Sequence, residues 1–92
     1  MFKNMSPSQA TELIKHLMTA DFTNLERRIF IMEARLAAYN YVQENDPKNT
    51  KAIEQAEAQL VKALDDAIKA GYDMAKELKS SHQLRKSTPK QM

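Results

Sequence analysis

The scarcity of glycine constrains the fold of this chain more than any other feature, because Gly71 is the only glycine among 92 residues. Folds with many tight turns need glycine and proline to reach positive φ and to interrupt strands, yet the chain has only three prolines. A β-sandwich, a β-barrel and a collagen-like chain are therefore disfavoured. A single glycine also rules out the glycine-rich loops that bind phosphates. The length suits one domain, which we predict to be all-α.

Two helices are predicted from signals at their N-terminal ends. Ser6 and Gln9 have the spacing of a capping box, and apolar residues then recur on one helical face, which predicts an amphipathic helix over 7–19. Thr23 opens a second capping box, which predicts a helix over 24–45. This second helix ends where the following proline disfavours helical geometry.

A third, longer helix is predicted over 47–78, with apolar residues at every third or fourth position and many alanines. Thr50 offers an alternative start one turn later. Gly71 could end this helix, with a short fourth helix after it. We favour a continuous helix, because the apolar pattern keeps its phase across Gly71.

The lengths and links of these helices predict how they pack. The helices over 24–45 and 47–78 are joined by a short link, so we expect them to be antiparallel neighbours in a helical hairpin. The longer helix, about 50 Å long, would extend about three turns beyond its partner. The helix over 7–19 either covers this overhang or folds back as a third member of a small bundle. We expect a helical domain over 1–79 and a disordered, basic tail over 80–92.

No combination of side chains in the sequence points to catalysis or to a bound metal. The chain has no cysteine, which removes thiolate metal sites and thiol nucleophiles. His16 follows Glu12 by one helical turn, but no second carboxylate–histidine pair completes a metal site. Nothing suggests a desolvated and oriented acid or base. We therefore expect no enzymatic activity, no metal, no cofactor and no small-molecule substrate.

Apolar residues on more than one side of the helix over 24–45 indicate binding to another protein. One neighbouring helix covers about one apolar stripe, and an uncovered patch usually marks an interaction site. We therefore expect a small protein-interaction module, such as a regulator, inhibitor, chaperone or assembly subunit of the kind that phages and mobile elements encode. Its partner is another protein, a second copy of this chain, or both, and we expect the chain to form a homodimer. The expected interface residues are Phe30, Ile31, Tyr39, Tyr41, Met74 and Leu78.

Weak nucleic-acid binding is the alternative function. Residues 79–92 carry four basic side chains and no acidic one, so the tail could attract phosphates without reading sequence. The expected contacts are Arg27, Arg28, Arg35, Arg85, Lys86 and Lys90. Glu26 directly precedes Arg27, and Glu33 lies between Arg28 and Arg35 along the chain, so both lower the local positive field. We therefore favour protein binding.

Membrane binding is not expected from this sequence. No apolar run approaches the about 20 residues that span a bilayer. The helix over 7–19 has few basic residues for an interfacial helix. Lys3 is not followed by the apolar stretch of a secretory signal, so we expect a cytoplasmic location.

Overall fold

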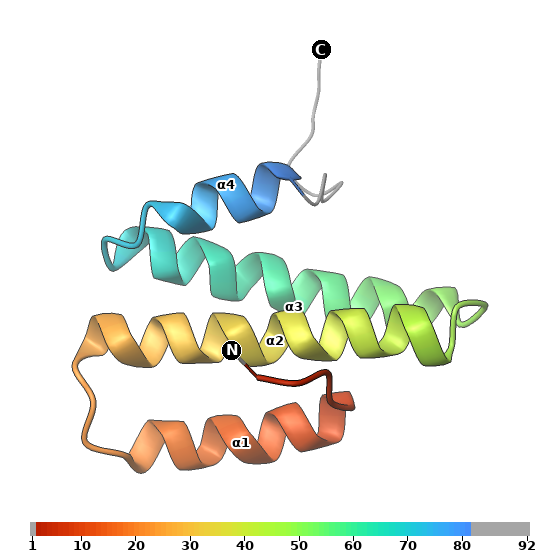
Figure 1. Ribbon diagram of the computed structural model, residues 1–92, viewed down its shortest axis with the longest axis horizontal. Helices are drawn as coiled ribbons and strands as arrows, with labels where there is room; N and C mark the ends of the chain where they lie inside the picture. Colours follow the sequence, from red (N-terminus) through yellow and green to blue (C-terminus); the bar gives the residue numbers. More distant parts are fainter. Residues whose placement is uncertain (1, 82–92) are drawn as a thin grey trace.

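The computed structural model describes residues 2–81, which form four helices and no strand. Consecutive helices run in opposite directions and lie side by side in chain order (Figure 1). The molecule is flat, with dimensions of 38 × 30 × 17 Å along its principal axes. The helices are α1 (Pro7–Thr19), α2 (Asn24–Asn45), α3 (Thr50–Lys69) and α4 (Met74–Ser81). The all-α prediction is confirmed, as are both ends of the first two helices.

Capping boxes fix the N-terminal ends of α1 and α2. The Ser6 hydroxyl accepts a hydrogen bond from the Gln9 backbone N–H at 3.2 Å, and the Ser6 N–H donates to the Gln9 side chain at 3.0 Å. Thr23 and Glu26 make the same reciprocal pair at 3.1 and 3.0 Å. These bonds satisfy backbone donors that the first helical turn leaves without partners, so the sequence signal is also the physical cause.

The start of α3 corrects the predicted helix over 47–78. α3 begins at Thr50, which was the alternative start. Asn49 is its N-cap, because the Asn49 Oδ1 accepts a hydrogen bond from the Ala52 N–H at 3.1 Å.

The end of α3 overturns the prediction of a continuous helix. Gly71 adopts φ 112°, a conformation that favours glycine. The Tyr72 N–H donates to the Ala67 carbonyl at 2.9 Å, and the Gly71 N–H donates to the Ile68 carbonyl at 3.0 Å. This pair of bonds is a Schellman motif, which satisfies the last carbonyls of α3 and turns the chain back. The predicted overhang therefore does not exist, since α2 and α3 have 22 and 20 residues.

The helix after the turn, α4, folds back along α3 instead of extending from it (Figure 1). Lys79 Nζ lies 2.9 Å from Asp65 Oδ1, which joins α4 to α3 by a partly buried ion pair. Ala75 is fully buried near Ala67, and Leu78 packs against the same cluster. α4 continues to Ser81, past the predicted domain boundary at residue 79. Residues 82–92 of the predicted tail lie outside the described residues.

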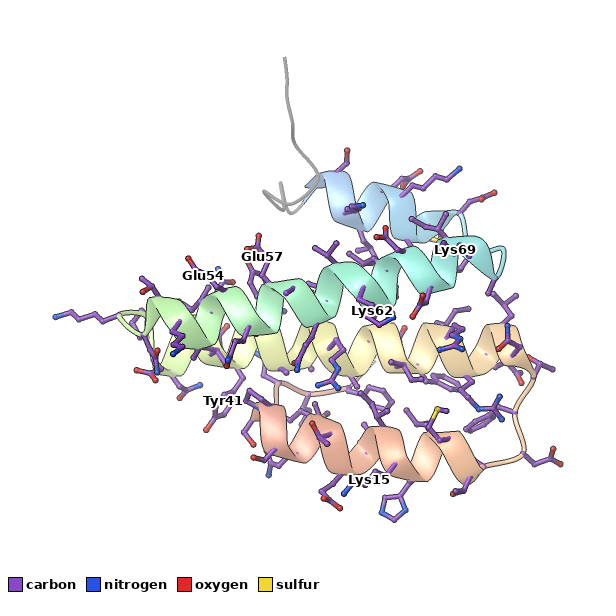
Figure 2. All side chains as sticks on the ribbon, turned by 180° about the vertical axis from the view of Figure 1, so that it is seen from behind. Lys15, Tyr41, Glu54, Glu57, Lys62 and Lys69 are labelled. Carbon is purple, nitrogen blue, oxygen red and sulfur yellow. The ribbon has the colours of Figure 1, made fainter. Side chains whose placement is uncertain are left out.

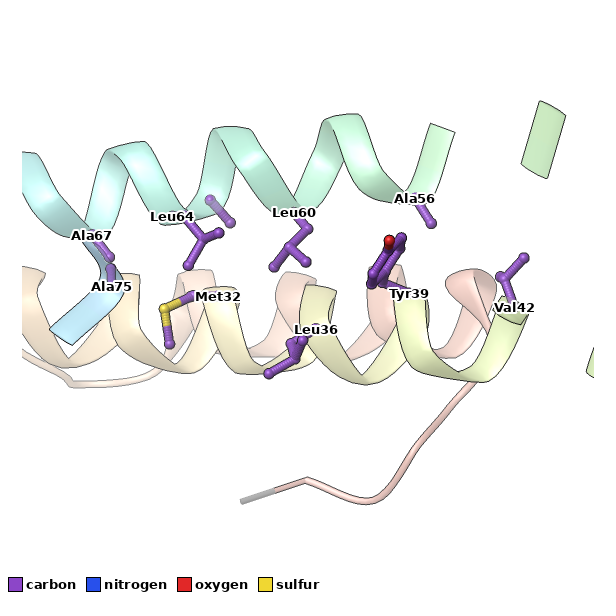
Figure 3. Close-up of a cluster of buried hydrophobic side chains, with 10 residues drawn as sticks. Met32, Leu36, Tyr39, Val42, Ala56, Leu60, Leu64, Ala67 and Ala75 are labelled. Atoms are coloured by element: carbon purple, nitrogen blue, oxygen red, sulfur yellow. The ribbon is translucent and has the colours of Figure 1, made fainter. Parts of the chain in front are cut away.

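The main core lies between α2 and α3 (Figure 3). Met32, Leu60 and Leu64 are its largest fully buried side chains. The remaining members of this core are Leu36, Tyr39, Val42, Ala56, Ala63, Ala67 and Ala75.

A second, smaller cluster joins α1 to α2. Ala10 of α1 is buried against Ala34 and Ala38 of α2, and these small side chains let the two helices approach closely. Phe2, Met5, Leu13 and Ile14 pack against this cluster. Of the two arrangements left open by the sequence, α1 therefore folds back as a third bundle member.

No helix within residues 2–81 is both long and apolar enough to cross a membrane.

Candidate functional site

One face of the helix layer is hollowed where α1 and α3 flank α2. The hollow has a volume of about 150 Å³. Its apolar lining is Ile14 of α1, Ile31 of α2 and Ala63 of α3. Its polar lining is Arg35, Gln59, Lys62 and Asp66. Lys62 lies at the boundary between α3 and α2 on the side seen in Figure 2.

A second hollow, of about 230 Å³, lies at the N-terminal end of α2 and the C-terminal end of α3. It is lined by Asn24, Arg28, Asp66, Lys69 and Ala70. Asp66 lines both hollows, so they adjoin and form one surface. We call the residues that line either hollow the groove.

Helical spacing brings the polar groove residues to one face. Arg28, Ile31 and Arg35 are three and four residues apart, so they lie on one side of α2. Lys62, Asp66 and Lys69 have the same spacing on α3. Because α2 and α3 are antiparallel neighbours, their two polar rows meet across the helix boundary.

Direct contacts join the two polar rows. Arg35 Nη1 donates to Gln59 Oε1 at 3.2 Å. Asp66 Oδ2 lies 3.6 Å from Lys62 Nζ and 4.0 Å from Arg28 Nη1. Asp66 therefore interacts with a cation from its own helix and with one from α2.

The groove carries a surplus of positive charge. Its cations are Arg28, Arg35, Lys62 and Lys69, and its only carboxylate is Asp66. The Lys62 side chain is 77% exposed, so its charge is available to a ligand. Burial lowers the pKa of Arg35 below its ordinary value, because it removes water from the guanidinium, but an arginine side chain stays protonated at neutral pH.

The opposite side of α2 is acidic. Glu26, Glu33 and Glu44 are separated by seven and eleven residues, so they share one side of the helix, about 180° from Arg28 and Arg35. Asn4 Nδ2 donates to Glu44 Oε1 at 3.0 Å, which ties the N-terminal segment to this side. α2 thus carries side chains of opposite charge on two opposite sides.

Some predicted interface residues make contacts within the molecule. Phe30 packs edge-to-face on Phe22, with ring centroids 5.0 Å apart, and its centroid lies 6.4 Å from that of Phe2. Tyr39 is only 8% exposed in the core between α2 and α3, so its ring is not available to a partner. Leu78 is half-buried against the same core.

Other predicted interface residues lie at the surface but not together. Ile31 is half-buried and lines the groove. Tyr41 is half-buried near the C-terminal end of α2. Met74 is 58% exposed at the start of α4. Of the predicted interface set, only Ile31 belongs to the groove.

The Arg27 side chain is hydrogen-bonded to backbone carbonyls. Its Nε donates to the Leu17 carbonyl at 3.2 Å, and its Nη2 donates to the carbonyls of Ala20 and Phe22 at 3.1 and 3.2 Å. The guanidinium therefore holds the end of α1 and the turn into α2. Its neighbour Arg28 lines the groove, as does Arg35. The predicted contacts Arg85, Lys86 and Lys90 lie outside the described residues.

The groove residues on α3 were missed by the sequence prediction. Neither Lys62 nor Lys69 is among the contacts predicted from the sequence. The sequence does carry a signal for them, because Gln59, Lys62 and Lys69 lie on one side of α3. Asp66 is the only acidic residue that this side contributes to the groove. Only the tertiary arrangement shows that these lysines lie beside the arginines of α2.

The described residues hold no group of three or more histidine, cysteine or acidic side chains that could bind a metal ion. Comparisons with protein-family models, curated proteins and solved structures find no match to this chain.

Proposed function

We propose that this protein is a small, non-enzymatic protein-interaction module that binds a segment of another protein in the groove. The observation that carries this proposal is the open hollow over Ile14, Ile31 and Ala63, rimmed by charged side chains. Helices commonly bind with their apolar side in such a groove, with apolar anchors at its centre and polar contacts at its rim.

The packing of α2 supports this proposal. One side of α2 is fixed to α3 through Met32, and another is fixed to α1 through Ala34. The walls of the groove are therefore formed before a partner arrives. Preformed walls lower the entropic cost of binding.

Nucleic-acid binding is the second candidate, because Arg28, Arg35, Lys62 and Lys69 lie on one face. Cations of this kind attract phosphates through counterion release. However, Asp66 lies between these cations, and a phosphate backbone gains nothing from the apolar wall. We therefore place protein binding first.

Site-specific photo-crosslinking tests the proposed function. A photoreactive amino acid replaces Gln55, an exposed residue one turn before Gln59 on α3, in the full chain expressed in cells. The matched control carries the same amino acid at Lys76, an exposed position on α4. After irradiation and nuclease treatment, we expect a discrete protein adduct from position 55 and none from position 76. Equal adducts from both positions, or a nuclease-sensitive adduct only, would contradict protein binding in the groove.

A further inference from the structure

We propose that the occupant of the groove is an amphipathic helix of another protein whose polar side is rich in aspartate and glutamate. This inference rests on the proposed function and names the class of partner. It is supported by a difference between the two walls of the groove, one of which is apolar and the other cationic.

The wall formed by α1 is apolar. Ile14 lines the groove, and Met18, one turn further along α1, is 54% exposed although it is a large apolar residue. Ile14 is the one residue that α1 contributes to the lining, so this side of the groove has no charged side chain. An apolar stripe of a partner helix would therefore gain most by facing α1 and the Ile31 floor.

The opposite wall is cationic. Lys62 and Lys69 of α3 lie on this side, and Arg28 and Arg35 of α2 lie beside them. Asp66 offsets one of these charges through its contacts with Lys62 and Arg28. A partner helix lying between the two walls would fit best with its carboxylates facing α3 and its apolar side chains facing α1.

The length of the groove suits a short helix. On the α3 side the groove extends from Gln59 to Ala70, and these eleven residue steps rise about 16 Å along the helix axis. A partner helix of about three turns covers this distance.

The positive charge of the groove argues against a segment of this chain, or a second copy of it, as the occupant. Residues 82–92 carry three basic side chains, Arg85, Lys86 and Lys90, and no acidic one, so this segment has the same sign as the groove. A twofold dimer through the groove would place the cations of one copy near those of the other. A second copy could dock only through its acidic side, which includes Glu33, in a head-to-tail contact.

Designed peptides test the inference directly. Three helical peptides of about 18 residues, long enough to cover the groove, share one leucine stripe and carry glutamate, glutamine or lysine at the other positions. Each is titrated into the full chain labelled with ¹⁵N, and dissociation constants are measured by fluorescence anisotropy. We expect the glutamate peptide to shift the amide signals around Ile14, Ile31 and Lys62. It should bind about tenfold or more tightly than the glutamine peptide at low salt.

A double charge reversal sharpens the test. Lys62→Glu with Lys69→Glu should weaken binding of the glutamate peptide about tenfold or more, and should create binding of the lysine peptide. The control, Lys48→Glu with Lys76→Glu, makes the same change in net charge at exposed positions outside the groove. It should change affinity less than about twofold. Far-UV circular dichroism checks that both variants keep their helix content.

Each remaining outcome would overturn the inference in a distinguishable way. Equal binding of the glutamate and glutamine peptides, or no amide shifts with any peptide at about 1 mM, would refute the acidic partner and leave the crosslinking result to decide the proposed function. Tighter binding of a short DNA duplex, with the same dependence on Lys62 and Lys69, would overturn both proposals. Self-association in sedimentation that the reversal abolishes would identify a second copy as the occupant.

Discussion

Replacing Arg27 by alanine should detach the end of α1 from α2 and destabilise the protein. The wild-type guanidinium donates to the carbonyls of Leu17, Ala20 and Phe22 at 3.1 to 3.2 Å. Two of these carbonyls lie at the end of α1 and just beyond it, where oxygens lack intrahelical partners and the helix dipole favours a positive charge.

The size of the effect follows from these contacts. A hydrogen bond from a charged donor contributes at least about 1.5 kcal/mol to stability when it is shielded from water, so three fully shielded bonds would contribute about 4.5 kcal/mol or more. Arg27 is only half-buried, and water would replace part of these bonds in the variant. We therefore expect Arg27→Ala to lower the free energy of unfolding by about 2 kcal/mol.

Urea denaturation followed by far-UV circular dichroism measures this change. A chain of this size has a denaturant slope of about 1 kcal/mol/M, so the midpoint should fall by about 2 M. The adjacent Arg28 provides a matched control, because its side chain is 37% exposed and its ion pair with Asp66 has an N–O distance of 4.0 Å. Arg28→Ala should cost about 0.5 kcal/mol or less.

Arg27→Lys separates charge from geometry. A lysine keeps the positive charge but lacks the planar fork that reaches several carbonyls at once, so it should recover less than half of the lost stability. Equal midpoints for Arg27→Ala and Arg28→Ala would refute the structural role of Arg27 in the turn between α1 and α2.

Four further changes test the fold by the same denaturation assay. Gly71→Ala should cost about 1 to 2 kcal/mol through backbone strain alone, because an added Cβ meets no atom within 4 Å. Leu60→Ala should cost about 3 kcal/mol, since the side chain is 1% exposed and leaves a cavity, and a loss below about 1 kcal/mol would contradict its place in the core. Thr23→Ala should cost about 1 kcal/mol by removing the cap of α2. Lys79→Ala should cost about 1 kcal/mol or less, while raising amide exchange in α4; unchanged exchange would show that the ion pair with Asp65 does not hold this helix.

The sequence by itself determined where α1 and α2 begin. A capping box is a local device, because Thr23 and Glu26 satisfy each other's backbone donors within one turn of chain. The start of each helix could therefore be predicted from residue type and spacing, without knowledge of what packs around its first turn. The apolar pattern of α2 also indicated that one neighbouring helix would not cover it, and Met32 and Ala34 are buried against α3 and α1 respectively.

Only the tertiary structure decided the end of α3 and the position of α4. The apolar pattern keeps its phase across Gly71, and this favoured one long helix over 47–78. The same pattern is satisfied when the chain turns at Gly71, because Ala75 and Leu78 then return to the core. The spacing of apolar residues shows which side of a helix is apolar. It does not show whether the chain continues as one straight helix or turns back to pack on the preceding one.

The groove was also decided by packing. Arg27 and Arg28 are consecutive and chemically identical in the sequence, yet one holds backbone carbonyls and the other faces solvent beside Asp66. Successive residues on a helix point about 100° apart, so their roles depend on which neighbouring helix each side meets. The approach of Arg35 to Gln59, 24 residues away along the chain, exists only because α2 and α3 lie against each other.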